Sequence, residues 1–423
     1  PPPPPPPPPP PRLQPPPPTA LDTRWYSSAA SDVYKRQANI DAPESGEYCL
    51  RCHMPKGWFE GRSHPADGSI LETDDIDYGV TCSICHRSVD PIPSVGDEAA
   101  SIDMSIRSTL SYPIPPGFVG SSAMIIDPDD NRRGLFSFNL SHPYHTAYQT
   151  DFLRQTGDAI TRSRMCGTCH NVHNPVLSWD EGREQFWPNE SGTPAPEFDK
   201  EKLFPIETTF DEWLYSDFAR GGVYAPQFAG DKPDGIVRTC QDCHMQRITG
   251  YAADQGFDAV YRDCQNTGCL PEHVFVGGNT WVPILLQDPD WRLSAELEGA
   301  YLEQTVLRAE VMLQKAAQLT IDLFDYGTHR SAVVRATNLT GHKLPTGYPE
   351  GRRMWINLKA YNEKDQVIYE SGAYNPSTGV LDEDEKIKVY ETKQGITPEL
   401  AELLSISAGE SFHFVLNNLS LIH

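Results

Sequence analysis

The feature that most constrains this chain is a pentapeptide, Cys-x-x-Cys-His, that occurs four times in its 423 residues. Two thiols separated by two residues can reach the two vinyl groups on one edge of a haem, and the His that follows projects under the ring to bind iron. The motifs therefore predict four covalently attached haem c groups. The attaching thiols are Cys49 and Cys52, Cys82 and Cys85, Cys166 and Cys169, and Cys240 and Cys243, and the predicted iron ligands are His53, His86, His170 and His244.

Other uses of paired cysteines fit this pattern less well. One such pentapeptide arises by chance in roughly one chain in a hundred of this composition, so four chance copies are excluded. A zinc site needs no His directly after the second Cys, because adjacent residues rarely bind one tetrahedral ion together. A thioredoxin-like redox pair would lie in a βαβ pattern, and none surrounds these motifs. Haem attachment is the preferred interpretation, with zinc and dithiol chemistry as the alternatives.

The composition agrees with a core that side chains only partly fill. Hydrophobic residues make up 38% of the chain, which also contains 39 Pro and 31 Gly. This apolar fraction is low for a large globular core. We expect a loop-rich structure in which bound haem supplies the missing apolar mass.

The net charge narrows the range of partners. It is formally −23 at pH 7, so the phosphates of nucleic acid would be repelled and nucleic acid is not expected as a partner. Such a surface would attract a cationic protein patch or a cationic mineral surface. The simpler interpretation is that the acidic surface keeps the protein soluble.

The supply of His is large enough to give every iron a second ligand. Thirteen His occur in the chain, and nine remain once the four motif residues are set aside. Met is scarcer, at seven, and Met54 and Met245 directly follow a motif, where they face awkwardly for a distal role. We therefore predict bis-His ligation, which gives lower reduction potentials than His/Met ligation.

Four of the nine His are our candidates for the distal positions. His145 lies 21 residues before Cys166, at the start of a short helix expected over residues 146–154, and His142 shares its Ser-His-Pro-Tyr-His segment. His273 precedes two Gly residues that would let the backbone approach a flat ligand closely. His342 lies in a tight loop between predicted strands. For each of them the alternative is a surface or hydrogen-bonded His.

The hydrophobic pattern predicts an α+β chain with two main parts. Residues 39–290 are expected to form a tetrahaem domain, mostly irregular and α-helical, with a helix also expected over 210–218. A helix over 294–319, within a linking segment 291–319, is predicted by the approximate 3.6-residue period of Leu297, Ala300, Tyr301, Leu307, Val311 and Ala316. Residues 320–423 then form a β-sandwich-like domain that is truncated. Its predicted strands are 319–324, 332–337, 354–361, 366–370 and 411–416, with a turn at 362–365.

Both ends of the chain look artificial, and residues 1–38 are left out of the fold prediction. Residues 1–18 are nearly all Pro, which allows only polyproline II or disorder. Haem is attached covalently outside the cytoplasm, so we expect a periplasmic or extracellular protein. Its signal peptide would have been lost with the true N-terminus. No apolar run is long enough to predict a transmembrane segment.

The remaining two cysteines, Cys264 and Cys269, enclose four residues. In an oxidising compartment a disulfide is expected, and free thiols or a further metal site are the alternatives. Two adjacent cations, Arg352 and Arg353, could pair with haem propionates or be ordinary surface residues.

Eight short segments, around the motifs and in the C-terminal part, together resemble those of a known protein family. They are residues 52–58 (CHMPKGW), 60–63 (EGRS), 65–69 (PADGS), 86–91 (HRSVDP), 166–171 (CGTCHN), 273–279 (HVFVGGN), 341–348 (GHKLPTGY) and 351–355 (GRRMW). Over about residues 40–420 the chain thus resembles multihaem cytochromes of the cytochrome c-552/c-554 type. The resemblance implies closely stacked haems and a His in the segments of His145, His273 and His342. A tetrahaem subset resembles extracellular cytochrome filaments, in which a subunit can lend a His to its neighbour.

The leading hypothesis is an electron carrier, either a soluble shuttle or a filament subunit, that serves redox partner proteins or extracellular electron acceptors. The second is a redox enzyme of the hydroxylamine oxidoreductase or nitrite reductase type. Such an enzyme needs an iron with an open position, and reductases of that kind often carry Cys-x-x-Cys-Lys, which is absent here. A third hypothesis is a β-sandwich adhesion module with structural haems.

Overall fold

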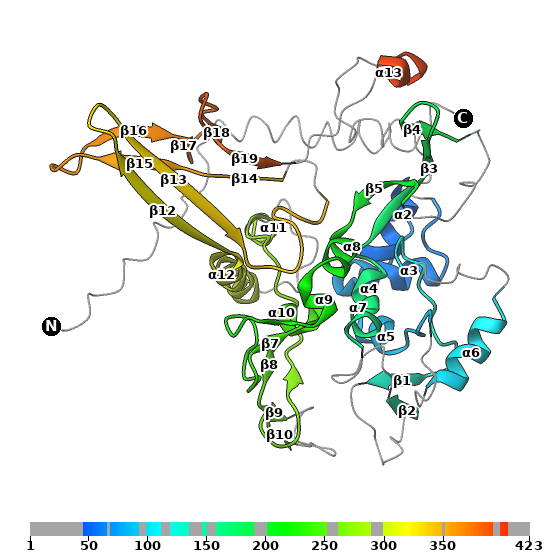
Figure 1. Ribbon diagram of the computed structural model, residues 1–423. Helices are drawn as coiled ribbons and strands as arrows, with labels where there is room; N and C mark the ends of the chain where they lie inside the picture. The colour runs from blue at the N-terminus through cyan, green and yellow to red at the C-terminus, as the bar shows by residue number, and fades with distance from the viewer. Residues whose placement is uncertain are drawn as a thin grey trace. The chain divides into compact units, whose positions relative to one another are not determined.

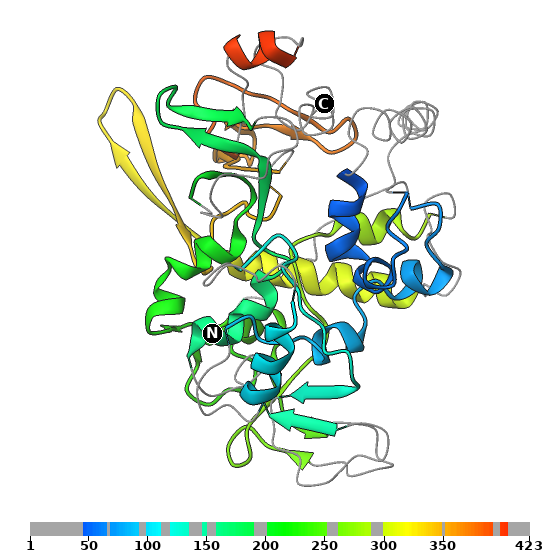
Figure 2. The same ribbon diagram turned by 90° about the vertical axis from the view of Figure 1, so that its right-hand side faces the viewer.

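The computed structural model describes eleven stretches of the chain, and Figures 1 and 2 show them as ribbons from two directions. The chain divides into two compact units, one formed by residues 44–349 and the other containing residues 350–422. The domain limits expected from the sequence, at 39, 290 and 319, stay predictions. The described stretches are residues 45–65, 68–92, 99–110, 119–134, 146–149, 158–189, 201–251, 261–288, 299–348, 352–391 and 398–404.

Short helices are typical of the first unit, and among its described residues only α12 is longer than nine residues. Local signals bound them: Asp158 caps the start of α7, and Gly79, with φ +50°, ends α4. No helix of the described stretches combines the length and the apolar character needed to cross a membrane. The helices are α2 (Ser45–His53), α3 (Pro55–Phe59), α4 (Thr73–Tyr78), α5 (Cys82–His86), α6 (Ala100–Ser108), α7 (Ala159–Gly167), α8 (Thr209–Leu214), α9 (Asp217–Arg220), α10 (Cys240–His244), α11 (Trp281–Leu285) and α12 (Gly299–Ala316).

The strands of this unit pair mostly in twos. One three-stranded antiparallel sheet has the order β4-β3-β5, and β12 pairs with β13 over nine residues as a long ribbon (Figure 1). The strands are β1 (Asn131–Gly134), β2 (Thr146–Gln149), β3 (Val172–Asp180), β4 (Gln185–Pro188), β5 (Leu203–Glu207), β6 (Val223–Tyr224), β7 (Ile236–Val237), β8 (Arg247–Ile248), β9 (Gly250–Tyr251), β10 (Tyr261–Arg262), β11 (Leu270–Pro271), β12 (Ala317–Asp325) and β13 (Arg330–Asn338).

One predicted helix is wrong. Residues 146–149, expected to begin a helix over 146–154, form β2, which pairs in parallel with β1. Figure 2 shows the two strands side by side as cyan arrows. The partner strand β1 comes from an earlier part of the chain. Hydrogen bonds with its backbone N–H and C=O groups stabilise the strand more than the weak helical pattern stabilises a helix.

The long helix is present, although its buried face differs from the expected one. α12 spans Gly299–Ala316 within the predicted 294–319. Its buried residues are Ala309, Met312 and Ala316, which lie three and four positions apart on one face. Leu307 and Val311, which contributed to the expected periodicity, are 60% and 47% exposed.

The main hydrophobic core of the first unit gathers around α8, α9 and the last motif. Phe210, Trp213 and Phe218 are buried in it, and Cys240 and Cys243 pack against it. Gly167 lies between the two cysteines of the third motif, where an added Cβ would be 2.7 Å from the Phe210 ring. The core therefore holds the third and fourth motifs close to the same aromatic side chains.

The described part of the second unit contains short antiparallel pairs. β14 pairs with β19, β15 with β16, and β17 with β18. The turn expected at 362–365 closes the β15–β16 hairpin, where the Asn362 amide donates to the Gln366 carbonyl at 3.0 Å. The β-sandwich stays a prediction, and the strand expected at 411–416 lies outside the described residues. The elements are β14 (Arg353–Trp355), β15 (Leu358–Tyr361), β16 (Val367–Ser371), β17 (Tyr374–Asn375), β18 (Val380–Leu381), β19 (Val389–Glu391) and α13 (Pro398–Leu404).

Candidate haem-binding site

All four Cys-x-x-Cys-His motifs lie on or at the end of a short helix. The second and fourth motifs coincide with α5 and α10, the first ends α2, and the third begins in the last turn of α7. Residues three and four positions apart share one face of a helix, so both thiols and the imidazole of a motif point to the same side. In α10 a capping box of Thr239 and Asp242 fixes the start of the helix. All eight motif thiols are free of disulfides.

Thiols of different motifs lie beside one another. The side chains of Cys169 and Cys52 are hydrogen-bonded, which lowers the pKa of Cys52 and raises that of Cys169. The side chains of Cys166 and Cys240 are hydrogen-bonded in the same way. The third motif is therefore a neighbour of both the first and the fourth.

The second motif has a buried thiol that is unsuited to dithiol chemistry. Burial raises the pKa of Cys85 to about 11, so this sulfur is a poor thiolate at neutral pH. A thioether carries no charge and pays no such desolvation penalty. The environment of Cys85 thus fits covalent attachment better than a reactive dithiol or a zinc thiolate.

The His of the second motif faces His273. Their ring centroids are 6.3 Å apart and the ring planes differ by 26°. Each Nδ1 contacts a backbone carbonyl oxygen, that of Arg133 at 2.7 Å for His86 and that of Pro271 at 3.0 Å for His273. An Nδ1–H donated to a carbonyl leaves Nε2 as the free lone pair of the neutral ring.

The His of the fourth motif faces His342 in the same manner. The centroids are again 6.3 Å apart, and the planes differ by 21°. Nδ1 of His244 contacts the carbonyl oxygen of Val276, and Nδ1 of His342 contacts that of Lys343 at 3.0 Å. Desolvation lowers the pKa of His244, which favours the neutral form that binds metals.

This spacing fits two imidazoles on opposite sides of one metal atom. An imidazole–metal bond is about 2 Å long, and the ring nitrogen lies roughly 1.1 Å from the ring centre. Two such ligands on one axis therefore have centroids roughly 6 Å apart. Direct ring stacking would bring them closer. A His that binds a metal typically donates its other ring N–H to a carbonyl or carboxylate oxygen in this way.

The imidazoles of the first and third motifs, His53 and His170, have no facing imidazole among the described residues. Nδ1 of His170 contacts Oε1 of Glu207 at 3.0 Å, and this hydrogen bond raises the pKa of His170. The distal candidates His142 and His145 lie outside the described residues. His173, which the sequence did not favour, is 3% exposed, and its Nε2 is 3.8 Å from the Asp211 carboxylate.

The loop of His342 is tied to α8 by contacts that sequence reasoning missed. Glu212 accepts hydrogen bonds from the amide of Lys343 at 2.9 Å and from the hydroxyl of Thr346 at 2.8 Å. The Thr209 hydroxyl accepts from the amide of Gly347 at 3.1 Å. The partners are 131 to 138 residues apart, so no spacing in the sequence could have indicated them.

A cleft of about 480 Å³ lies between α8 and this loop, and His342 is part of its wall. The lining residues are Thr208, Asp211, Glu212, Tyr215, Ser216, Asn338, Thr340, Gly341, His342 and Lys343.

A fully buried ion-pair network supports the second motif. Arg133 donates to Asp103 at 2.6 and 2.9 Å and to Asp127 at 2.8 Å, and all three side chains are at most 1% exposed. The carbonyl oxygen of the same Arg133 contacts His86. The network therefore fixes the backbone group that orients this imidazole.

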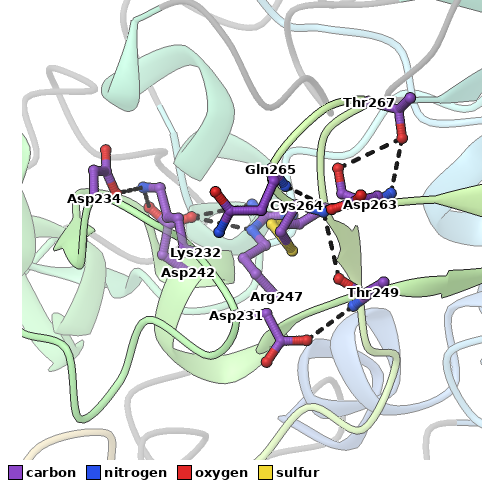
Figure 3. Close-up of a disulfide and its surroundings, with 11 residues drawn as sticks. Asp231, Lys232, Asp234, Asp242, Arg247, Thr249, Asp263, Cys264, Gln265 and Thr267 are labelled. Carbon is purple, nitrogen blue, oxygen red and sulfur yellow. Dashed lines mark hydrogen bonds and ion pairs between the residues drawn. A yellow bond between two sulfur atoms is a disulfide. The ribbon is translucent and has the colours of Figure 1, made fainter.

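The predicted disulfide is confirmed. Cys264 and Cys269 are bonded, and the bridge closes the turn between β10 and β11 (Figure 3). β11 leads directly to His273. The other predicted pair, Arg352 and Arg353, lies in the second unit, where Arg353 contacts Glu383 at 3.3 Å.

Comparison with known proteins adds one structural likeness. No protein-family model matches the chain, and no curated protein matches its sequence. The chain is similar to the crystal structure of a penta-haem cytochrome c552 from Thermochromatium tepidum, with 16% identity over 84% of this chain and 75% of that chain. The TM-score is 0.38.

Proposed function

We propose that this chain is an electron-transfer protein that carries four covalent haem c groups, one on each Cys-x-x-Cys-His motif. The observation behind the proposal is the twofold occurrence of facing imidazoles at 6.3 Å, His86 with His273 and His244 with His342. A bound haem supplies reversible one-electron chemistry. With imidazoles on both faces, an iron has no position left for a substrate, which favours a carrier over an enzyme.

The residues of this chain would attach the haems, orient their imidazole ligands and hold neighbouring haems close together. Two thiols hold each group covalently, and carbonyl oxygens at Nδ1 of the four facing imidazoles leave their Nε2 atoms to bind iron. Contacts between Cys52 and Cys169, and between Cys166 and Cys240, bring three sites next to one another. His142 and His145 remain our candidates for the second ligands of the sites at His53 and His170.

The setting of this activity is part of the proposal. Covalent haem attachment implies the periplasm or the outside of the cell, with redox partner proteins or extracellular acceptors as the electron partners. Assembly into filaments is a narrower possibility within the same function. Electron microscopy of the purified protein tests it, since particles that stay monomeric at all concentrations exclude filaments.

Electron paramagnetic resonance of the oxidised full-length protein tests the carrier function. Mass spectrometry should find four haems, and the spectrum should contain low-spin ferric signals alone. Changing His273→Ala or His342→Ala should each convert one of the four signals to high spin. His329→Ala is the matched control, because His329 lies in the exposed β12–β13 turn against Tyr326. High-spin iron in the unmodified protein, or fewer than four haems, contradicts the proposal.

A further inference from the structure

The chain that leaves the fourth motif runs antiparallel to the segment that leads to His273. β8 pairs with β11 in a regular register. The pairing continues one residue beyond both strands, because the amide of Glu272 donates to the carbonyl of Gln246 at 2.9 Å. The two segments therefore form a continuous ladder up to Glu272.

The register changes directly after this contact. The amide of Val276 donates to the carbonyl of His244 at 3.0 Å, so the three residues 273–275 lie opposite the single residue Met245. The carbonyls of His244 and Gln246 can be at most about 7 Å apart, whereas four extended residues span about 13 Å. The excess chain has to leave the ladder, as it does in a β-bulge. We call residues 273–275 the ligand bulge.

Phe275 is the residue of the ligand bulge with an unusual backbone. Its φ is +45°, in the left-handed region that residues with a Cβ seldom adopt. A positive φ turns the chain sharply, and the segment returns to His244 at the next residue. The phenyl ring is 60% exposed and lies edge-on to the His273 ring, with centroids 6.0 Å apart. Its backbone conformation, more than its packing, therefore distinguishes Phe275.

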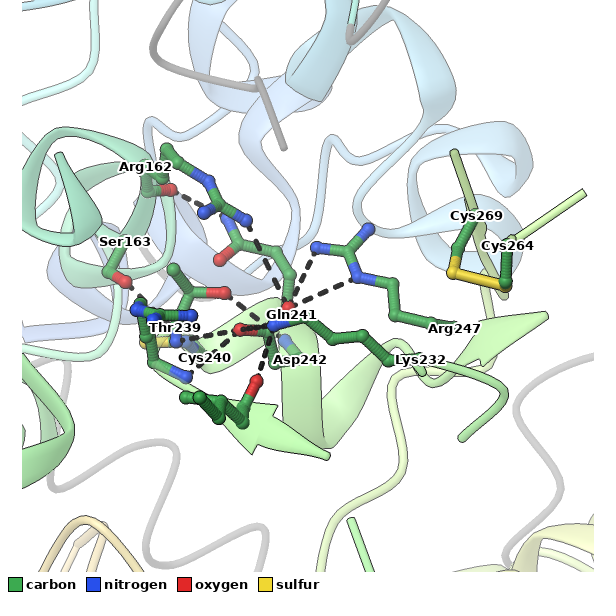
Figure 4. Close-up of polar contacts among 12 residues, drawn as sticks. Arg162, Ser163, Lys232, Thr239, Cys240, Gln241, Asp242, Arg247, Cys264 and Cys269 are labelled. Carbon is green, nitrogen blue, oxygen red and sulfur yellow. Dashed lines mark hydrogen bonds and ion pairs between the residues drawn. A yellow bond between two sulfur atoms is a disulfide. The ribbon is translucent and has the colours of Figure 1, made fainter. Parts of the chain in front are cut away.

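Both sides of the ligand bulge are fixed. Val274 packs against the hydrophobic core, and Val276 is buried within it. On the opposite side Arg247 of β8 donates to Asp242 of α10 at 3.2 Å, and Lys232 lies 3.6 Å from the same carboxylate (Figure 4). These contacts hold β8 to the helix of the fourth motif, so the change of register has to be taken up by the bulge.

The ligand bulge directs two groups to different sites. His273 lies at its start and faces His86, with ring centroids 6.3 Å apart. Directly after its end, the carbonyl oxygen of Val276 contacts Nδ1 of His244. Had the regular register continued, Val274 would lie opposite His244 in place of Val276. Both groups thus depend on the extra residues.

We propose that the left-handed backbone of Phe275 positions groups of two haem sites at once, His273 for the iron at His86 and the carbonyl of Val276 for the imidazole of His244. This inference rests on the proposed haem-binding function. Phe275 is a positioning residue, because it acts through the two residues beside it in the loop. The second and fourth sites therefore share one backbone conformation.

Substitutions chosen for their backbone preferences test the inference, with high-spin ferric iron counted by electron paramagnetic resonance in the full-length haem-loaded protein. Phe275→Val introduces a β-branched residue that disfavours a positive φ, and the sites at His86 and His244 should both become high spin. This is twice the high-spin iron of His273→Ala, which removes one ligand and leaves Phe275 in place. Phe275→Gly and Phe275→Asn tolerate a positive φ and should keep four low-spin haems.

Glu184→Val is the matched control for backbone strain. Glu184 also has a positive φ, of +52°, and lies on the exposed β3–β4 turn of the same unit. This variant introduces the same β-branched side chain at a left-handed position and should keep four low-spin haems. As much high-spin iron as in Phe275→Val would show a general effect of strain and would overturn the inference.

Two further outcomes overturn the inference and leave the proposed function standing. If Phe275→Gly or Phe275→Asn produces as much high-spin iron as Phe275→Val, the ring and not the backbone positions the loop. If Phe275→Val converts one site only, the bulge does not serve both sites.

A Phe275→Val protein that fails to bind haem leaves Phe275→Gly to decide. Four low-spin haems in Phe275→Gly support the need for a left-handed backbone, and high-spin iron in it overturns the inference. Absence of haem from the unmodified chain contradicts the proposed function instead.

Discussion

The two imidazole pairs have the same spacing and are held in different ways. His273 is placed by backbone contacts: β11 pairs with β8, and the amide of Glu272 donates to the Gln246 carbonyl at 2.9 Å. His342 is placed by side chains of α8, chiefly Glu212. The position of His273 depends on a loop closed by a disulfide, and the position of His342 depends on a few polar contacts across a cleft. The second pair should therefore be easier to break without unfolding the chain.

The loop that carries His273 also serves the other pair. The carbonyl of Val276 accepts from His244, and the amide of Val276 donates to the His244 carbonyl at 3.0 Å. The four-residue segment 273–276 thus links the proposed distal ligand of one site to the carbonyl group that contacts the imidazole of another. Disturbing this loop should affect both pairs, whereas disturbing α8 should affect one.

The largest effect is expected from Arg133→Met, which breaks the support of the His86 pair. The change leaves Asp103 and Asp127 as buried charges without their cation, and should destabilise the first unit by about 3–5 kcal/mol. Urea unfolding followed by tryptophan fluorescence measures the loss. Arg183→Met is the control, because Arg183 lies on the β3–β4 turn with its side chain 50% exposed and pairs with Asp180 at the end of β3. Equal losses in the two variants would show that the buried network is unimportant.

A smaller loss of stability is expected when the disulfide that closes the loop shared by both pairs is removed. Replacing both Cys264 and Cys269 by Ser removes a closed loop of six residues, worth about 2 kcal/mol on the chain-entropy account. High-spin iron should rise at two sites together, as measured by electron paramagnetic resonance. A change at one site alone contradicts the sharing of the loop.

A loss of stability of similar or smaller size is expected from a change that affects the pair at His342 and leaves the pair at His86 intact. Glu212→Ala removes the acceptor of Lys343 and Thr346, at a cost of about 1–3 kcal/mol, and frees the loop of His342. One site should become partly high spin and the His86 pair should keep its signal. Glu212→Gln, which retains one carbonyl acceptor, should show a weaker effect. Loss of both signals would mean that the pairs are not held independently.

The smallest expected effect is a loss of stability at low pH, and it arises at Asp75, away from both imidazole pairs. Hydrogen bonds from Arg62 hold the pKa of Asp75, on α4, at about 2, below its ordinary value. A lowered folded-state pKa stabilises the fold above the unfolded value near 4, and that contribution disappears as the pH falls towards 2. Asp75→Asn should flatten the stability profile in this window. An unchanged profile, measured by circular dichroism, contradicts the assignment.

Local pattern was sufficient for some elements and not for others. The helix of α12, the β12–β13 ribbon and the turn after Tyr361 follow from the periodicity of adjacent residues. The strand β2 could not be foreseen, because its helix-like pattern is overridden by pairing with β1. The buried face of α12 was also misjudged, since which residues a helix buries depends on what packs against it.

For the candidate site the sequence alone determined the chemistry. The spacing of the four motifs specifies two thiols and an imidazole on one side of a short helix, and this needs no information beyond five consecutive residues. The disulfide was equally local, since Cys264 and Cys269 are five positions apart. The sequence also indicated His273 and His342 as ligand candidates.

Only the tertiary structure decided how these residues are paired. His273 is nearer in sequence to His244, yet it faces His86, and His342 faces His244 instead. The tether at Glu212, the carboxylate at His170 and the cations around Asp242 likewise join residues from different segments of the chain. Such contacts depend on how the backbone closes around its core, and closure over long loops leaves no periodic trace in the sequence.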